Sequence, residues 1–521
     1  MIVIRSIFFH SLTTCLFLND PARRGIYIAN WYGNFGALTE CGQISDMKKL
    51  ISGIILILLA LCSGQGFAQH SINGIWEGRL KLNIELRLVF HFSTDSNGKW
   101  TAVLNSPDQS PKDIACSGVS IYGDSIRVDV ASVGGHYLGK IFKDSLITGA
   151  WTQGGNFQLD LHKVDKVSEL LRPQTPKPPF SYRSEEVEYD NAGKTIHYGA
   201  TITIPPGKGP YPALVMITGS GQQDRNEEIA RHQPFAVIAD WLTRHGYIVL
   251  RADDRGIGKS TGDFSKSTSE DFEKDVEAHL DYLESRKEVD RKRIGLIGHS
   301  EGGMIAPMVA VRRRDVSFIV LLAGPGVKIT QLMEDQTAAV LKSAGIIQSA
   351  IDDYRLLYRK LLPAVVNAEN KKIALENSQV IASDWQKNTK AVVVRATTGI
   401  TNDSTRNVFV ETMVNILYTP WFIYFLKYDP APVVEQLSCK VLALNGEKDI
   451  QLLAKPNLAG LESALKKSKS KSYQTKEIPG LNHLFQHCKS CTVAEYAQLQ
   501  ETFAPEALNL ITEWLNREVK K

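Results

Sequence analysis

Six short apolar runs, separated by longer helical stretches, constrain the fold of this 521-residue chain more than any other feature. Several of the runs are apolar on both faces, which is typical of parallel strands buried between two layers of helices. Between them, segments 234–245 and 269–286 place their apolar residues on one helical face. We therefore predict an α/β domain over residues 182–521, with a doubly wound, mostly parallel sheet. The predicted strands are Ala213–Thr218, Tyr247–Ala252, Arg293–Ile297, Phe318–Leu322, Val441–Leu444 and Tyr473–Ile478.

Residues 327–430 interrupt this alternation and have a mostly helical pattern. A helical insertion at the edge where parallel strands end would cover any site there, so we predict a cap. The cap contains an aromatic cluster at helical spacing. Packing is the more common role of such a cluster, although one or two members could line a pocket. The cluster consists of Tyr418, Trp421, Phe422, Tyr424, Phe425 and Tyr428.

Residues 70–164 have a different pattern, with short alternating runs and turn signals such as Asn97-Gly98 and Gly134-Gly135. About nine short strands in this length predict a small antiparallel barrel or sandwich. Four prolines in residues 165–181 predict a stiff, extended linker between the two domains.

Residues 47–68 have the three-part pattern of a secretory signal peptide. A Met-Lys-Lys start is followed by a 12-residue apolar run, too short to span a membrane comfortably, and then by small residues. A lipoprotein acylated at Cys62 is less favoured because the preceding residue is Leu61 rather than a small one. Residues 1–46 then reflect a start codon assigned too early. We expect an exported protein, periplasmic or extracellular, without stable membrane insertion.

Charge and cysteine content narrow the class of protein further. The 60 basic and 56 acidic residues nearly balance, which gives no electrostatic reason to bind nucleic acid. Cys488 and Cys491 have CxxC spacing, but a second pair, which a zinc site would need, is missing. We favour a local disulfide, with two free thiols as the next alternative. With no ligand cluster or phosphate-binding loop in the sequence, we expect neither a metal nor an organic cofactor. The sequence carries no signal for an oligomeric state.

The segment Gly298-His299-Ser300-Glu301-Gly302 joins a predicted strand directly to a predicted helix. A serine at such a tight turn has strained backbone geometry and projects its hydroxyl above the sheet, and the flanking glycines avoid collisions. The helix N-terminus also directs free N–H groups toward a developing oxyanion. This context predicts Ser300 as a nucleophile and the Glu301 N–H as one oxyanion donor.

Together with this turn, four other stretches make the chain resemble the α/β-hydrolases. Among these it is similar to the secreted bacterial esterases grouped with prolyl-oligopeptidase-like (S9-type) hydrolases. The similarity covers about residues 182–518. It implies the chain order serine, acid, histidine, and such proteins also occur with a β-rich segment in front. The stretches are Thr218–Asn226, Asp253–Ser260, Asn445–Asp449 and Gly480–His483.

A serine nucleophile needs a base, and the base needs an orienting acid. His483 lies in a Gly/Asn loop after the last predicted strand, where the resemblance places the base, and His487 is the alternative. Asp449 follows the preceding strand, where the resemblance places the acid, and Glu447 could substitute for it.

The loop after the strand Ala213–Thr218 is predicted to supply the second oxyanion donor, with the Ser220 N–H as first choice. Asp254 and Arg255 belong to a segment that we expect to brace this loop by charge-assisted hydrogen bonds rather than to contact substrate.

These residues predict a serine hydrolase that cleaves small-molecule carboxylic esters through an acyl-enzyme on Ser300. A peptidase or amidase with the same three residues is the alternative. It is less favoured because the β-rich segment is too short for the propeller that peptidases of this fold usually carry. A non-catalytic binding protein on the hydrolase fold is the second alternative, and intact Ser300, Asp449 and His483 argue against it. A haloalkane dehalogenase would have an aspartate at position 300.

Overall fold

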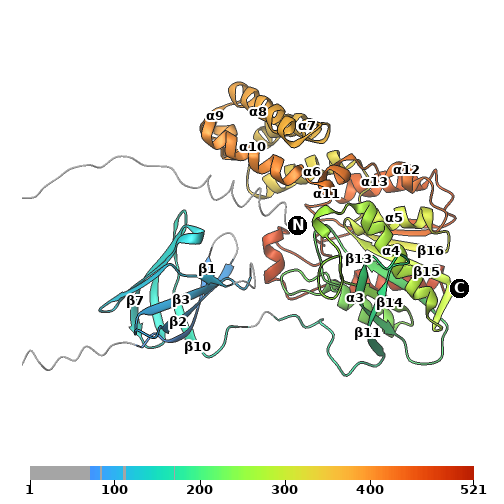
Figure 1. Cartoon of the computed structure of the whole chain (residues 1–521), viewed down its shortest axis with the longest axis horizontal. Coiled ribbons are helices and arrows are strands. Elements are labelled where there is room, and N and C mark those ends of the chain that lie inside the picture. Colours follow the sequence, from blue (N-terminus) through green and yellow to red (C-terminus); the bar gives the residue numbers. More distant parts are fainter. Residues whose placement is uncertain (1–70, 82–84, 109–112, 169–170, 521) are drawn as a thin grey trace, which may run out of the picture. The chain divides into compact units, whose positions relative to one another are not determined.

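The computed structural model of the chain in Figure 1 describes residues 71–520, with gaps at 82–84, 109–112 and 169–170. The predicted signal peptide at 47–68, its acylation candidate Cys62 and the upstream segment 1–46 lie outside the described residues. The chain divides into two compact units, with the boundary between Val167 and Ser168. We call them the β unit and the α/β unit.

The described part of the β unit forms one antiparallel sheet, which confirms the predicted antiparallel domain. Its strands are β1 (Gly74–Lys81), β2 (Glu85–Thr94), β3 (Trp100–Asn105), β4 (Ile114–Ala115), β5 (Gly118–Tyr122), β6 (Ser125–Val130), β7 (Gly135–Lys143), β8 (Leu146–Thr152), β9 (Asn156–Gln158) and β10 (Leu161–Val164). Their order is β4-β3-β2-β1-β10-β8-β7-β6-β5, and β9 pairs with β8. Leu104 of β3 and Ile126 of β6 come from near opposite ends of this order but share one core with Trp76. The sheet therefore curls around a common interior, as a barrel does.

The α/β unit contains a second, mostly parallel sheet. Its strands are β11 (Arg183–Asp190), β12 (His197–Ile204), β13 (Tyr211–Ile217), β14 (Ile248–Ala252), β15 (Val289–His299), β16 (Val316–Leu322), β17 (Lys440–Gly446) and β18 (Tyr473–Ile478). Their order is β11-β12-β14-β13-β15-β16-β17-β18. The six predicted strands, β13 to β18, pair in parallel. Strands β11 and β12 were not predicted, and they add an antiparallel edge.

Helices cover both faces of this sheet. They are α3 (Pro234–Arg244), α4 (Ser269–Ser285), α5 (Gly302–Arg312), α13 (Ala454–Leu465) and α14 (Pro505–Glu518). Successive strand residues point to opposite faces. On β13, Val215 packs in one cluster with α4, α5 and α13, whereas Met216 packs in another with α3 and α14. The predicted doubly wound arrangement is therefore confirmed.

A helical insertion lies between β16 and β17. Its helices are α6 (Ile329–Ser343), α7 (Gln348–Val366), α8 (Lys371–Asn388), α9 (Ala391–Thr398), α10 (Asp403–Leu417), α11 (Pro420–Lys427) and α12 (Ala431–Val434). Figure 1 shows α6 and α11 nearer the sheet and α7 to α10 farther out. The core of the insertion includes Met304 and Met308 of α5. The helix that follows Ser300 therefore anchors the insertion.

None of the described helices is by itself long and apolar enough to cross a membrane, but the bent pair Ala391–Leu417 and Pro420–Lys427 together meets those criteria.

Candidate active site

Ser300 occupies the turn between β15 and α5, in a left-handed backbone conformation with φ of 54°. This conformation is uncommon for a residue with a side chain and costs free energy. The Ser300 N–H donates a 2.8 Å hydrogen bond to the carbonyl of Leu322 on β16, which fixes the turn. A Cβ on Gly298 would collide with the backbone of Gly302, and one on Gly302 with the carbonyl of Ile217. The turn therefore requires both glycines.

His483 and Asp449 form a buried pair from the loops after β18 and β17. The Nδ1–H of His483 donates a 2.7 Å hydrogen bond to Oδ2 of Asp449. The other oxygen of Asp449 accepts 2.8 Å bonds from the backbone N–H groups of Gln451 and Leu452. The side-chain amide of Asn445 also donates to Oδ2, at 3.2 Å. These donors hold the carboxylate in place, and the carboxylate in turn fixes the orientation of the imidazole ring.

The two alternative residues lie elsewhere. His487 is exposed and pairs with Glu501 and Glu506. Glu447 is exposed as well, accepting a hydrogen bond from the Gly480 N–H and pairing with Lys448. The structure therefore brings Asp449, and not Glu447, to His483.

One pocket is lined by both Ser300 and His483, and about 760 Å³ of space there is not filled by atoms, part of it open to solvent. Part of its wall comes from the insertion, through α6 and α11. Three members of the aromatic cluster line it, one more than the sequence suggested. The apolar lining residues are Ile229, Pro325, Leu332, Met333, Trp421, Phe422, Phe425, Leu452 and Leu484.

The loop after β13 lies against the serine turn, and Ser220 lines the same pocket as Ser300. Among the described residues, neither the Ser220 N–H nor the Glu301 N–H donates a hydrogen bond to the protein. Asp254 accepts 2.8 Å bonds from the Thr218 hydroxyl and the Gln223 N–H. These two bonds brace the loop at both ends, as expected for Asp254.

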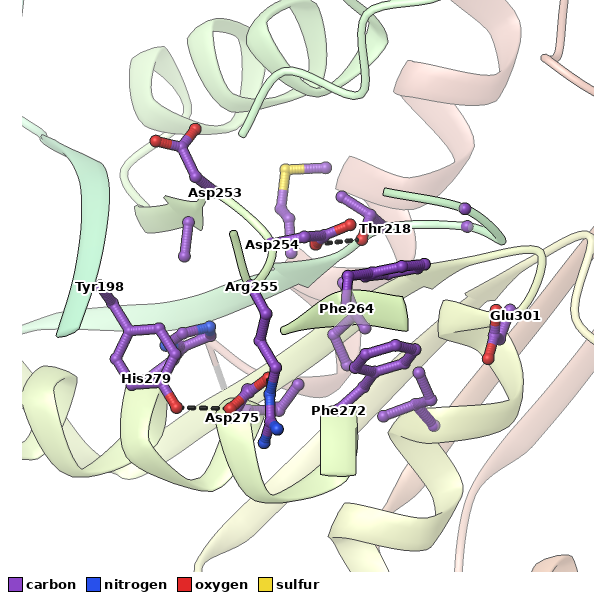
Figure 2. Close-up of a pocket in the computed structure, with 17 residues that line it drawn as sticks. Tyr198, Thr218, Asp253, Asp254, Arg255, Phe264, Phe272, Asp275, His279 and Glu301 are labelled. Atoms are coloured by element: carbon purple, nitrogen blue, oxygen red, sulfur yellow. Dashed lines mark hydrogen bonds and ion pairs between the residues drawn. The ribbon is translucent and has the colours of Figure 1, made fainter. Parts of the chain in front are cut away.

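Behind this loop is a second pocket, shown in Figure 2. Figure 2 shows Asp254 turned toward Thr218, whereas Arg255 points the other way, toward Asp275 on α4. Burial raises the pKa of Asp254 well above its usual value, although the hydrogen bonds from Thr218 and Gln223 act against this. The segment is thus structural support for the loop, with Arg255 tying it to α4.

A second buried acid–histidine pair was not predicted from the sequence. His299, which precedes Ser300, places Nδ1 2.9 Å from Oε1 of Glu227 and Nε2 3.0 Å from the carbonyl oxygen of His483. The same Oε1 accepts a 2.7 Å bond from the Gly219 N–H. In the sequence, only position could have identified these two residues. His299 directly precedes the predicted nucleophile Ser300, and Glu227 directly follows the stretch Thr218–Asn226.

Two smaller findings concern sulfur and metal ligands. Cys488 and Cys491 form a disulfide, as the favoured interpretation of the sequence predicted. Within the described residues, no group of three or more His, Cys, Asp or Glu side chains is arranged to hold a metal ion.

Comparisons with known proteins found similarity to hydrolases and an esterase. Residues 226–409 match the family model described as "Hydrolase_4: Serine aminopeptidase, S33". Esterase EstD of Thermotoga maritima is 33% identical over 165 residues, which cover 31% of this chain and 39% of that protein. The putative hydrolase YtaP of Bacillus subtilis is 36% identical over 118 residues, covering 19% of this chain and 38% of that protein. The matches thus span about two fifths of each curated relative.

Solved structures with low sequence identity also align. An α/β hydrolase GrgF from Penicillium sp. sh18 is 16% identical, with a TM-score of 0.39, and the alignment covers 65% of this chain and 100% of that one. The Pyrococcus furiosus esterase Pf2001 is 15% identical, with a TM-score of 0.36, covering 65% and 94%. The fold assignment rests instead on the family match and on the observed sheet and serine turn, which together make the α/β unit an α/β-hydrolase fold.

Proposed function

We propose that the α/β unit is a serine hydrolase that cleaves carboxylic esters, with Ser300 as nucleophile, His483 as base and Asp449 as orienting acid. One observation carries this proposal. The imidazole of His483, hydrogen-bonded to Asp449 at 2.7 Å, lines the same pocket as Ser300. Ser300 itself is held in a left-handed backbone conformation. A serine, a histidine and an oriented acid are the groups that acyl transfer requires.

In the proposed reaction, Ser300 Oγ attacks the carbonyl carbon of the ester and its proton passes to Nε2 of His483. Asp449 stabilises the imidazolium that forms. Collapse of the tetrahedral intermediate breaks the bond to the alcohol oxygen, which takes the proton from His483 and leaves an acyl group on Ser300. Water, deprotonated by His483, then attacks this acyl-enzyme, and the acid and free Ser300 are released.

The backbone N–H groups of Ser220 and Glu301 are the proposed oxyanion donors. Both are without a hydrogen-bond acceptor among the described residues, so both are free to donate to a substrate oxygen. Such donors stabilise the charge that develops on the carbonyl oxygen, and the loss of one costs about 3 kcal/mol of transition-state stabilisation.

Ester rather than amide substrates are favoured by the lining of the pocket. An aminopeptidase must hold the positive α-amino group of its substrate, which calls for a free carboxylate. Two carboxyl groups line this pocket, and neither offers an uncompensated negative charge: Glu227 is paired with His299, and burial raises the pKa of Glu301, which favours its neutral form. The family description, which names a serine aminopeptidase, supports the amide alternative, and the substrate test must therefore include amides.

The proposal is tested by fluorophosphonate labelling and a substrate panel. The wild-type protein should be labelled on Ser300 and should hydrolyse p-nitrophenyl esters, and Ser300→Ala should do neither. Acyl chains from acetate to palmitate and acetylated glycans would define the acyl group, and aminoacyl p-nitroanilides would measure the amide alternative. Equal labelling of Ser300→Ala would reject the nucleophile, and faster cleavage of the anilides would favour the peptidase. An unlabelled wild-type protein would favour the binding protein.

Three further features belong to the same proposal. We propose that helices α6 to α11 act as a cap over the pocket, that the chain is related to prolyl-oligopeptidase-like hydrolases, and that it is exported. Residues of α6 and α11 line the pocket, which supports the proposal of a cap. The mass of the N-terminus of the protein purified from its native cells would test export, because cleavage of the predicted signal peptide would leave a chain that begins near Gln69.

A further inference from the structure

We infer that Glu227 and His299 form a charged pair that holds the oxyanion loop and the backbone of His483 in fixed positions around Ser300. This inference rests on the proposed function, because it concerns the geometry of that reaction. Both residues act through other groups, so they are positioning residues rather than catalytic ones.

The hydrogen bonds of His299 fit a doubly protonated ring beside an ionised Glu227. A carbonyl oxygen can only accept a hydrogen bond, so Nε2 of His299 must carry a proton to bond the carbonyl of His483 at 3.0 Å. An ionised carboxylate also only accepts, so Nδ1 must carry a proton to bond Glu227 at 2.9 Å. With both nitrogens protonated, His299 is a cation beside an anionic Glu227.

The pair is buried, and burial makes its charge balance important. Glu227 is 1% exposed and His299 is 5% exposed. Burial by itself lowers the pKa of His299, but the Glu227 carboxylate and the two hydrogen bonds outweigh it, and the pKa is raised. Breaking such a pair by removing one charge is costlier than its net contribution to stability suggests, because the other charge is left buried and uncompensated.

Three segments that must meet at Ser300 are joined by this pair. Oε1 of Glu227 also accepts the Gly219 N–H at 2.7 Å, which fixes the residue before the proposed donor Ser220. The His299 bond fixes the backbone of His483, and His299 itself is covalently joined to Ser300. Glu227 is held in a left-handed conformation with φ of 51°. This costs about 1 kcal/mol for a residue with a side chain, a cost that the three hydrogen bonds offset.

The charge on Glu227 also matters while His483 is protonated. The rings of His299 and His483 lie 4.8 Å apart between centroids. A lone cation at that distance would oppose proton uptake by His483. Because the negative charge of Glu227 balances the positive charge of His299, the two ring N–H groups of His299 can donate hydrogen bonds near Ser300 without this repulsion.

Glu227→Gln tests the inference because it keeps the shape and an accepting oxygen but removes the charge. His299 then favours the neutral form, which has one N–H. If that N–H stays on the His483 carbonyl, Nδ1 must accept from the introduced amide nitrogen, which cannot also accept the Gly219 N–H, so at least one of the three hydrogen bonds of the pair is lost. We expect kcat for p-nitrophenyl acetate to fall about 10- to 100-fold and KM to change less than about 3-fold, as for misplaced catalytic groups. The matched control is Glu228→Gln, which alters the neighbouring exposed carboxylate and should retain wild-type kcat.

Nitrogen-15 NMR of histidine-labelled protein provides a readout that does not need activity. In the wild-type protein at pH 7.5, both ring nitrogens of His299, assigned by comparison with His299→Gln, should be protonated. In Glu227→Gln, one should not be. A neutral His299 in the wild-type protein, or an unchanged kcat in a folded Glu227→Gln, would overturn the inference. Failure of fluorophosphonate to label the wild type would reject the proposed function instead, and the NMR result would still decide whether the pair is charged.

Discussion

The indole Nε1 of Trp421 donates a 2.8 Å hydrogen bond to Oε1 of Glu301, the residue that follows Ser300. The same oxygen accepts a 2.6 Å bond from the Ser269 hydroxyl at the start of α4. Burial raises the pKa of Glu301, although both donors act against this. Because Trp421 lines the pocket from α11, the serine turn itself positions part of the pocket wall.

Trp421→Phe is expected to weaken substrate binding more than the chemical step. Phenylalanine keeps an aromatic wall but cannot donate to Glu301, so α11 loses its link to the serine turn. We expect KM for p-nitrophenyl esters to rise several-fold with kcat nearly unchanged, and the free energy of unfolding to fall by about 1 kcal/mol. Steady-state kinetics and urea unfolding measure the two effects.

Trp385→Phe is the matched control for that variant. Trp385, on α8, donates a 2.9 Å bond to the carbonyl of Asp353 and does not line the pocket. It should lose similar stability at an unchanged KM. If both variants raise KM equally, the Trp421–Glu301 bond has no special role in positioning the wall.

The difference between what the sequence predicted and what the structure adds follows from the range of the interactions. The serine turn was predictable because the strand, the glycines and the helix are contiguous in sequence. The Glu227–His299 pair joins residues 72 positions apart, and Trp421–Glu301 joins residues 120 apart. A single sequence has no periodicity or spacing that marks such contacts, so they emerge only when the chain is folded.

The missed strands have a related explanation. In β11, Arg183–Asp190, charged residues occupy most positions, because the strand lies at the sheet edge and exposes five of its eight residues. It therefore lacks the apolar run that marked β13 to β18. Strand β12 is buried along most of its length. It was missed because the predicted pattern alternated strands with helical segments, whereas no helix separates β12 from β13.

Asp449→Asn is expected to reduce kcat by about 10³- to 10⁴-fold with little change in KM, because an amide can present an N–H to Nδ1 of His483 and favour the wrong tautomer. Rates for p-nitrophenyl acetate under saturating conditions measure the effect. The matched control is Glu447→Gln, two residues away in the same loop, which should keep its activity. A large loss in Glu447→Gln with none in Asp449→Asn would exchange the two assignments.

Gly302→Ala is expected to disrupt the serine turn. An added Cβ would collide with the Ile217 carbonyl, a backbone atom that cannot move aside cheaply. We expect at least about 2 kcal/mol lower free energy of unfolding, or loss of soluble protein, together with loss of fluorophosphonate labelling. Gly345→Ala is the matched control. Gly345 has a φ of 82° but open space around it, so an alanine there introduces backbone strain without a collision. Gly345→Ala should lower the free energy of unfolding by only about 1 kcal/mol and leave fluorophosphonate labelling intact. Equal losses in the two variants would show that the collision at Gly302 does not cause the effect.

His232 should make the stability of the α/β unit sensitive to mild acid. Burial, assisted by the positive charge of Arg172, lowers the pKa of His232 from 6.5 to about 4. Its bonds suit the neutral ring, with Nε2–H donating to the Tyr496 carbonyl and Nδ1 accepting from the Thr502 hydroxyl. The folded protein therefore stays unprotonated at His232 while the unfolded chain takes up a proton below about pH 6.5, so stability is lost as the pH falls toward 4.

From pH 7.5 to pH 5, this linkage should remove about 2 kcal/mol from the free energy of unfolding. Urea unfolding at the two pH values measures the difference. His232→Gln, whose amide can make the same two hydrogen bonds without titrating, should show a difference about 2 kcal/mol smaller than the wild type. His245→Gln, which alters an exposed histidine in the same unit, should keep the wild-type difference. If His232→Gln keeps it too, His232 takes up its proton without unfolding the chain, and the acid sensitivity has another source.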